Sequence, residues 1–169
     1  MKKRYLFEAI LGMLIVGLVA LKPDPSLRVF IFLETECPIS QKTTQRIQAL
    51  ADAYAGRVTF EAVYPTETVT PQEVGAFERA YSLRIPRRLD PQHRLVKRYQ
   101  ATTTPEVILV SGSDKILYRG SVDDQFYQLG KYRPAPTQFY LKDAIEAALH
   151  NRAVAVPKTT AVGCLINNQ

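Results

Sequence analysis

The sequence contains little cysteine and little glycine for its length, with two cysteines and eight glycines in 169 residues. A small domain held together by disulfides needs more cysteines, and a collagen-like chain needs glycine at every third position. Both classes are therefore excluded. With 46% hydrophobic and 22% charged residues, the chain has the composition of one ordinary globular domain that is long enough to bury a core.

A long basic segment is also missing. The formal net charge is +6, but +2 of it falls in the first 25 residues, where four basic residues outnumber two acidic ones. No run of Lys and Arg is interleaved with aromatic residues, which would indicate a surface for nucleic acid. Binding to nucleic acid is therefore not predicted, and we expect Arg84, Arg87 and Arg88 to lie in a solvated loop.

The hydrophobic run near the N-terminus is short for a membrane span. Residues 9–21 are 13 consecutive apolar residues, whereas a bilayer core needs about 20. The basic residues Lys2, Lys3 and Arg4 precede this run, and that order is typical of an export signal. We expect residues 1–25 to be a signal peptide or an uncleaved membrane anchor. Residues 26–169 would then lie outside the cytoplasm, either periplasmic or anchored in the inner membrane, where disulfides are permitted.

Hydrophobic periodicity predicts an alternation of strands and helices in the rest of the chain. Thr70, Pro71 and Glu73 have the pattern of a helix start. The predicted strands are 27–33, 57–64, 106–110 and 115–119. The predicted helices are 39–54, 71–81, a short one that opens at Asp90, and 137–150. Residues 85–88 and 123–136 are expected to be loops, and residues 152–169 an extended tail without helical period.

This order of elements resembles that of a thioredoxin-like domain, an α/β fold with a central mixed sheet flanked by helices. Cys37 lies where the first strand meets the first helix, and Thr104-Pro105 precedes the third strand, where that fold carries a cis-proline. The resemblance implies that a cis Pro105 faces the reactive cysteine. It also implies that the backbone of Thr104 is free to pair with a bound peptide, and that Pro38 and Ser40 adjoin the same substrate site.

A narrower resemblance rests on short segments in a fixed order. The chain is similar to exported bacterial redoxin-domain proteins of the alkyl hydroperoxide reductase and thiol-specific antioxidant branch. The similarity extends over residues 27–166. The segments that carry it are Thr104-Pro105-Glu106, Leu117-Tyr118-Arg119-Gly120, Val122-Asp123-Asp124, Gly130-Lys131-Tyr132-Arg133-Pro134 and Ala161-Val162-Gly163-Cys164.

Cys37 has the local sequence of a reactive thiol. A free cysteine with a pKa near 8.5 is only a few per cent ionised at neutral pH. The unpaired amides at a helix N-terminus stabilise an anion, Pro38 suits the first helical turn, and Ser40 offers a hydroxyl to the sulfur. Glu36 opposes a very low pKa. Because the flanking residues are polar, we expect the thiol near the surface; the alternative is a buried cysteine that acts as a small hydrophobic residue.

Ser40 stands where thioredoxin-like oxidoreductases usually carry a second cysteine. Cys37 then depends on an external thiol or on a distant cysteine to resolve a mixed disulfide. Cys164 is the only other cysteine, 127 positions downstream in the apolar tail. Three arrangements remain open: a cycling pair, two independent thiols, or a static disulfide. A static disulfide would stabilise the fold by roughly 4 to 5 kcal/mol in the chain-entropy estimate.

The predicted function is an exported thiol-disulfide oxidoreductase with Cys37 as nucleophile and Cys164 as resolving cysteine. Its partners would be protein or small-molecule thiols and disulfides, with a thioredoxin-like protein as electron donor. One alternative is a peroxidase of the peroxiredoxin type. The Pro and Thr or Ser of those enzymes would fall at Phe30 and Glu34, which disfavours it. Another alternative is a non-catalytic, membrane-tethered binding module with a structural disulfide.

No metal site or cofactor is predicted. A copper-delivering relative would need a second cysteine near Cys37 and a histidine, and both His93 and His150 are expected on helix surfaces. Asp123 and Asp124 are either an acid and base pair or carboxylates that shape a turn. Arg119, Lys131 and Arg133 are further candidates for lowering the pKa of a nearby thiol or for binding an anion.

Overall fold

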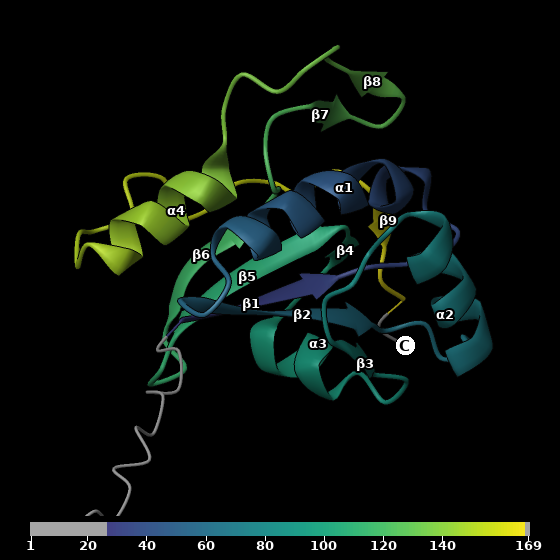
Figure 1. The fold of residues 1–169 in the computed structure, drawn as a ribbon. Coiled ribbons are helices and arrows are strands. Elements are labelled where there is room, and N and C mark those ends of the chain that lie inside the picture. Colours follow the sequence, from purple (N-terminus) through teal and green to yellow (C-terminus); the bar gives the residue numbers. More distant parts are fainter. Residues whose placement is uncertain (1–26, 168–169) are drawn as a thin grey trace, which may run out of the picture.

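A five-stranded mixed sheet forms the centre of the computed structural model, which describes residues 27–167 (Figure 1). The strand order is β3-β2-β1-β5-β6. Strands β1, β2 and β3 are parallel to one another, whereas β5 pairs antiparallel with both β1 and β6. The bounds are β1 Leu27–Phe32, β2 Val58–Tyr64, β3 Arg87–Leu89, β5 Glu106–Ser111 and β6 Ile116–Gly120. The predicted α/β class with a central mixed sheet is confirmed.

Helices cover both faces of this sheet, which explains why β1 reads as an almost continuous apolar run. Val29 and Ile31 pack with helices α1, α2 and α4, whereas Phe30 and Phe32 pack with α3 on the opposite face. Figure 1 shows α1 and α4 over one face and α3 under the other. The helices are α1 Pro38–Ala53, α2 Pro71–Ala80, α3 Arg94–Tyr99 and α4 Tyr140–Leu149. Helix α2 begins with the predicted capping box of Thr70 and Glu73.

Three predicted boundaries are wrong. Helix α3 begins at Arg94 and not at Asp90, whose carboxylate instead accepts hydrogen bonds from the amides of Arg94 and Leu95 (2.8 Å each). Residues 87–89 form the edge strand β3 instead of a loop, because they pair in parallel with the end of β2. The last helix begins at Tyr140 and not at Thr137. The carbonyl of Gln138 accepts a hydrogen bond from the amide of Asp124 (3.2 Å), so it is committed to the preceding loop and not to the helix.

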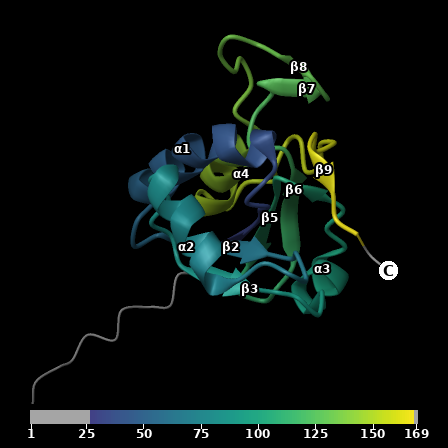
Figure 2. The same cartoon turned by 90° about the vertical axis from the view of Figure 1, so that its right-hand side faces the viewer.

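The predicted loop 123–136 contains a small hairpin. Strands β7 (Phe126–Gln128) and β8 (Lys131–Tyr132) pair antiparallel. Both views show this hairpin standing away from the sheet, beyond α1 (Figures 1 and 2). Tyr127, Leu129 and Tyr132 are exposed on it.

The C-terminal tail, which follows α4, returns across the fold to a short strand that directly precedes β5. It first follows β6, where the amide of Arg119 donates to the carbonyl of Pro157 (3.1 Å) and the amide of Thr159 to the carbonyl of Arg119 (3.0 Å). It ends in β9 (Cys164–Leu165), which pairs antiparallel with β4 (Thr103–Thr104). Figure 2 shows β9 at the outside of the fold.

The predicted leader, residues 1–25, lies outside the described residues. Among the helices of residues 27–167, none is both long and apolar enough to cross a membrane.

Candidate active site

Cys37 is the residue that immediately precedes α1. Its backbone is extended (φ −74°, ψ 115°), and Pro38 occupies the first turn of the helix. The amide of Gln41 donates to the carbonyl of Cys37 (3.0 Å), which closes the first turn. The sulfur therefore lies at the N-terminal end of a 16-residue helix, where the partial positive charge of the helix favours an anion.

The Cys37 side chain is only 1% exposed, so the expectation of a thiol near the surface is wrong. The neighbours Glu36 and Pro38 are exposed, but the thiol points the other way, toward the carbonyl oxygen of Thr104 (3.2 Å). The tail covers it from the remaining side, because both the amide and the thiol of Cys164 hydrogen-bond to the Cys37 sulfur. Local sequence does not reveal this cover, which comes from the far end of the chain.

Cys164 reaches Cys37 through strand pairing. In the β4–β9 pair, Cys164 lies opposite Thr104 and Leu165 opposite Thr103. The amide of Ile166 extends the pairing by donating to the carbonyl of Thr102 (2.9 Å). Both cysteines are free thiols; Cys164 is partly exposed, whereas Cys37 is buried. The structure thus brings together the two cysteines of the chain in their reduced form.

The two thiols have opposite pKa shifts. Burial raises the pKa of Cys37, but hydrogen bonds from the Cys164 thiol, the Ser40 and Cys164 amides and the Ser40 hydroxyl outweigh it and leave the pKa below its ordinary value. Burial raises the pKa of Cys164, and the hydrogen bond with Cys37 and the charges of Cys37 and Glu34 add to this. The first thiolate of the pair is therefore on Cys37, with Cys164 as its proton-bearing donor.

Ser40 is a fully buried member of the site. It is 0% exposed, and its hydroxyl oxygen accepts a hydrogen bond from the amide of Glu34 (3.4 Å) while the hydroxyl donates to the Cys37 sulfur. A serine at this position supplies two donors to a thiolate, from its amide and its hydroxyl. It provides no second sulfur, so that a resolving thiol has to come from elsewhere.

The Thr104–Pro105 peptide bond is cis, and Pro105 is buried. The backbone of Thr104 is not free, because Cys164 occupies its pairing position. The Thr104 hydroxyl donates to the carbonyl of Cys164 (3.4 Å) and is 3.5 Å from a carboxylate oxygen of Glu34. In this state the tail occupies the position next to Thr104 where the resemblance to thioredoxin-like domains predicts a bound peptide.

Gly163 is a site residue to which sequence reasoning assigned no role. A Cβ atom added to it would lie 2.0 Å from the carbonyl oxygen of Thr104 and 3.1 Å from Cδ of Pro105. No side chain fits at these distances, so only glycine lets the tail approach β4 this closely. The available signal was the glycine directly before the second cysteine.

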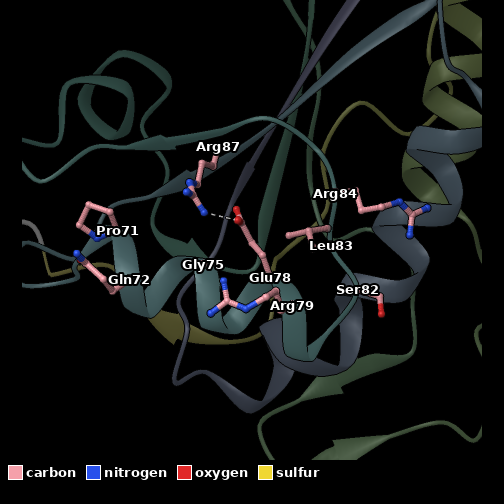
Figure 3. A pocket seen from close by; sticks show the side chains of 9 residues that line it. All are labelled: Pro71, Gln72, Gly75, Glu78, Arg79, Ser82, Leu83, Arg84 and Arg87. Carbon is pink, nitrogen blue, oxygen red and sulfur yellow. Dashed lines mark hydrogen bonds and ion pairs between the residues drawn. The ribbon is translucent and has the colours of Figure 1, made fainter.

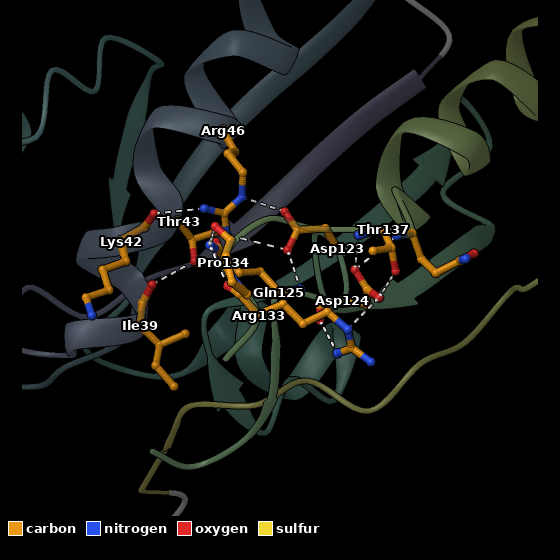
Figure 4. Close-up of polar contacts among 11 residues, drawn as sticks. Ile39, Lys42, Thr43, Arg46, Asp123, Asp124, Gln125, Arg133, Pro134 and Thr137 are labelled. Carbon is orange, nitrogen blue, oxygen red and sulfur yellow. Dashed lines mark hydrogen bonds and ion pairs between the residues drawn. The ribbon is translucent and has the colours of Figure 1, made fainter. Parts of the chain in front are cut away.

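The two neighbouring carboxylates at 123 and 124 hold the β7–β8 hairpin to the body of the fold (Figure 4). Asp123 forms an ion pair with Arg46 (2.5 Å), and Asp124 accepts hydrogen bonds from the amide and hydroxyl of Thr137 (2.7 Å each). Burial alone would raise the pKa of Asp124, but these bonds, the amide of Gln138 and the charge of Arg133 lower it to about 2. Both groups are therefore committed as acceptors.

Two of the three remaining charged candidates are also engaged. Arg119 forms an ion pair with Glu106 (3.6 Å) and donates to the carbonyl of Tyr99 (2.6 Å). Arg133 pairs with Asp124 (3.4 Å). Lys131 is exposed on β8.

The three arginines expected in a solvated loop are exposed, as predicted, but each forms an ion pair. Arg87 pairs with Glu78, Arg88 with Glu61 and Arg84 with Asp52. Arg84 and Arg87 line a cavity of about 500 Å³ along α2 (Figure 3). Neither cysteine lines this cavity.

The two histidines lie in different surroundings. His93 is buried and its Nε2 hydrogen-bonds the carbonyl of Pro65 (2.8 Å), so its predicted place on a helix surface is wrong. His150 is exposed at the end of α4, as predicted. Within residues 27–167, no three His, Cys, Asp or Glu side chains are grouped so that they could hold a metal ion.

Comparison with known proteins identifies solved structures that have a similar fold. No protein-family model matches the chain, and no curated protein matches it significantly. A hypothetical protein from Sinorhizobium meliloti 1021 is 26% identical, with 85% of this chain and 80% of that chain covered and a TM-score of 0.74. A candidate thioredoxin from Neisseria meningitidis is 17% identical, with 77% and 79% covered and a TM-score of 0.59.

A third solved structure is described as a secreted disulfide oxidoreductase. It comes from Mycobacterium tuberculosis and is 16% identical, with 73% of this chain and 83% of that chain covered and a TM-score of 0.53. The likeness of this structure and of the candidate thioredoxin covers about three quarters of the chain and concerns the fold. The described part of the chain therefore has a thioredoxin-like α/β fold.

Proposed function

We propose that this protein is a thiol-disulfide oxidoreductase whose redox-active pair is Cys37 and Cys164. The observation that carries the proposal is that both cysteines meet at Thr104. Cys164 lies opposite Thr104 in the β4–β9 pair, and the carbonyl of Thr104 accepts a hydrogen bond from the Cys37 thiol (3.2 Å). A disulfide between the two requires no rearrangement of the central sheet. The class of chemistry also fits the description of the neighbour from Mycobacterium tuberculosis.

The reaction begins with the Cys37 thiolate, whose pKa is lowered by its four hydrogen-bond donors. It attacks one sulfur of a substrate disulfide, and the other substrate sulfur leaves as a thiolate. Cys164 then gives up its proton to that thiolate, attacks the sulfur of Cys37 and releases the second substrate sulfur as a thiolate. This thiolate takes up from solvent the proton that Cys37 lost on ionisation. The substrate gains two electrons and two protons, and the protein is left with a Cys37–Cys164 disulfide.

Opening of the tail is part of this cycle, because Cys37 is 1% exposed while the tail is closed. The β4–β9 pair is two residues long on each strand. So short a pairing opens locally at a small fraction of the global unfolding free energy. Substrate disulfides therefore reach Cys37 in the reduced protein when β9 moves off β4.

The direct test is the redox state of the pair under native conditions. The reduced protein is incubated with hydroxyethyl disulfide, and free thiols and intact mass are followed. We expect loss of both thiols and of two hydrogen atoms, and recovery of both on addition of dithiothreitol without unfolding. Cys37→Ser should abolish turnover, and Cys164→Ser should stop at the mixed disulfide. A disulfide that forms or breaks only in denaturant would contradict the proposal and favour a structural bridge.

Peroxidase activity is the alternative outcome. Glu34 stands three residues before Cys37, where peroxidases of this fold carry a hydroxyl, and its carboxylate lies 3.5 Å from the Thr104 hydroxyl. Addition of hydrogen peroxide to the reduced protein separates the two functions. A loss of the Cys37 thiol no faster than that of free cysteine supports exchange over peroxidase chemistry.

Export is part of the proposal. The basic Lys2, Lys3 and Arg4 before the apolar residues 9–21 support a location outside the cytoplasm, where a thioredoxin-like partner would supply electrons. Fractionation of cells that express the full chain, followed by determination of the N-terminal residue, tests the location and shows whether the leader is cut.

A further inference from the structure

The two cysteines of the redox pair differ in exposure. Cys37 is 1% exposed, whereas Cys164 is partly exposed. Leu165, the next residue on β9, is 82% exposed, so the outer side of the tail is open to solvent. A molecule that approaches the closed site therefore meets the tail, which carries Cys164, before it can meet Cys37.

In the oxidised protein, this difference in exposure persists because the tail cannot open. In the reduced protein, β9 is held to β4 by a short pairing that can open. In the oxidised protein, the Cys37–Cys164 bond ties the tail to the residue that it covers. Cys37 is then enclosed by Ser40, Thr104 and the tail itself, and opening of the cover would require breakage of the very bond that is to be reduced.

We propose that the thiol which reduces the oxidised protein attacks the sulfur of Cys164, and that Cys37 departs as the thiolate; the inference rests on the proposed function of the pair. The covered position of Cys37 and the tail position of its partner thus give the reductive half of the cycle a different point of attack from the oxidative half, in which Cys37 is the reacting residue.

The relative quality of the two cysteines as leaving groups also favours attack at Cys164. In thiol-disulfide exchange, the sulfur with the lower thiol pKa leaves faster. Burial raises the pKa of both thiols. The amides of Ser40 and Cys164 and the Ser40 hydroxyl, which persist in the disulfide, lower the pKa of Cys37, whereas the nearby charge of Glu34 raises that of Cys164 further. Attack at Cys164 thus expels the better leaving group. The Cys37 thiolate then forms where hydrogen-bond donors already surround its sulfur.

The step balances with a thiol as the only co-reactant. A thiolate forms a bond with the Cys164 sulfur, the Cys37–Cys164 bond breaks, and the electron pair stays on Cys37. A second thiolate then attacks the outer sulfur of the mixed disulfide, and Cys164 takes up a proton. The reductant is oxidised to its disulfide, and the protein regains both thiols.

The test traps the mixed disulfide in the wild-type protein. The oxidised protein is mixed with 2-mercaptoethanol, which is uncharged and so is not selected by nearby carboxylates. The reaction is stopped with acid at early times, free thiols are alkylated, and peptides are analysed by mass spectrometry. We expect the mercaptoethanol adduct on Cys164 and the alkyl group on Cys37, in at least about tenfold excess over the reverse pattern.

The control is the same oxidised protein in denaturant, where cover and hydrogen bonds are lost and the adduct should divide between Cys37 and Cys164. A native-state adduct mainly on Cys37, or divided as in denaturant, overturns the inference and leaves the proposed function intact. Failure of the two cysteines to form a disulfide at all would instead contradict the proposed function.

Discussion

Cys164 lies directly opposite Thr104 in the β4–β9 pair, and the carbonyl of that same threonine accepts a hydrogen bond from the thiol of Cys37 (3.2 Å). One residue thus aligns both sulfurs. The two cysteines are 127 positions apart in the chain, but each is positioned by a neighbour of the cis-proline at 105. The geometry of the pair therefore depends on how closely the tail approaches Thr104.

Substitution of Gly163 should uncover Cys37. In Gly163→Ala, the added Cβ would fall 2.0 Å from the Thr104 carbonyl oxygen, so β9 must move away. We expect iodoacetamide to alkylate Cys37 about tenfold faster, measured in a Cys164→Ser background so that only one thiol reacts; this corresponds to about 1.4 kcal/mol in the opening equilibrium.

The matched control for this change is Gly75→Ala. A Cβ there would meet only the ends of the flexible side chains of Arg79 and Arg87, at 3.4 and 3.5 Å. Its alkylation rate should equal that of the parent. Equal rates for the Gly163 and Gly75 variants would show that the tail does not control access to Cys37.

Removal of the thiol donor should raise the pKa of Cys37. Cys164→Ala leaves the backbone pairing but removes the side-chain hydrogen bond that stabilises the Cys37 thiolate. Cys164→Ser keeps a hydroxyl donor, so its pKa should rise less. The pH dependence of alkylation gives the pKa in each variant, independently of any change in exposure that alters the plateau rate. An order in which serine raises the pKa more than alanine would contradict the assigned hydrogen bond.

The fold could be predicted from the sequence because its signals are local. Val29 and Ile31 alternate with Phe30 and Phe32, and this apolar run indicates a strand that is buried on both faces. Thr70 and Glu73 form the capping-box pattern that predicts the start of α2. The edge strand β3 gave no such signal. Its three residues are rich in arginine, and only pairing with β2 makes them a strand.

The site could be predicted only in part for a different reason. The position of Cys37 before a helix follows from its neighbours, but its burial depends on Gly163 and Cys164. Long-range pairing of a two-residue strand leaves no periodicity in the sequence. His93 illustrates the same limit, because its partner is the carbonyl of Pro65, 28 positions away.

Loss of the Asp124 charge should destabilise the fold in a pH-dependent way. Because its pKa is lowered to about 2 in the folded protein, from about 3.9 in an unfolded chain, the charge contributes stability above about pH 4. That contribution is lost as the pH falls toward 2. Asp124→Asn should therefore lower the free energy of unfolding by about 2 kcal/mol at pH 7.

Urea unfolding of both proteins at pH 7 and near pH 2 measures this effect, and the difference between wild type and variant should shrink at the lower pH. Glu67→Gln removes an exposed carboxylate and should change the free energy of unfolding by less than about 0.5 kcal/mol. A difference for Asp124→Asn that is independent of pH would mean that the lost shape of the loop, and not the charge, is responsible.

Oxidation of the pair should stabilise the whole domain. A bond between Cys37 and Cys164 closes a loop of more than 120 residues, for which the chain-entropy estimate is roughly 4 to 5 kcal/mol. The free energy of unfolding in urea should rise by up to this amount when the reduced protein is oxidised. Cys164→Ser should show no difference between oxidising and reducing conditions.

The rate of reduction then decides whether this stability belongs to a static bridge or to a cycling one. If the pair cycles, dithiothreitol reduces it in the folded protein because Cys164 is partly exposed, and the rate is the same with and without mild, non-denaturing urea. A static bridge would instead be reduced at the rate of global unfolding and would accelerate steeply with urea. Measurement of the reduction rate against urea concentration below the unfolding transition distinguishes the two, since both predict the same gain in stability.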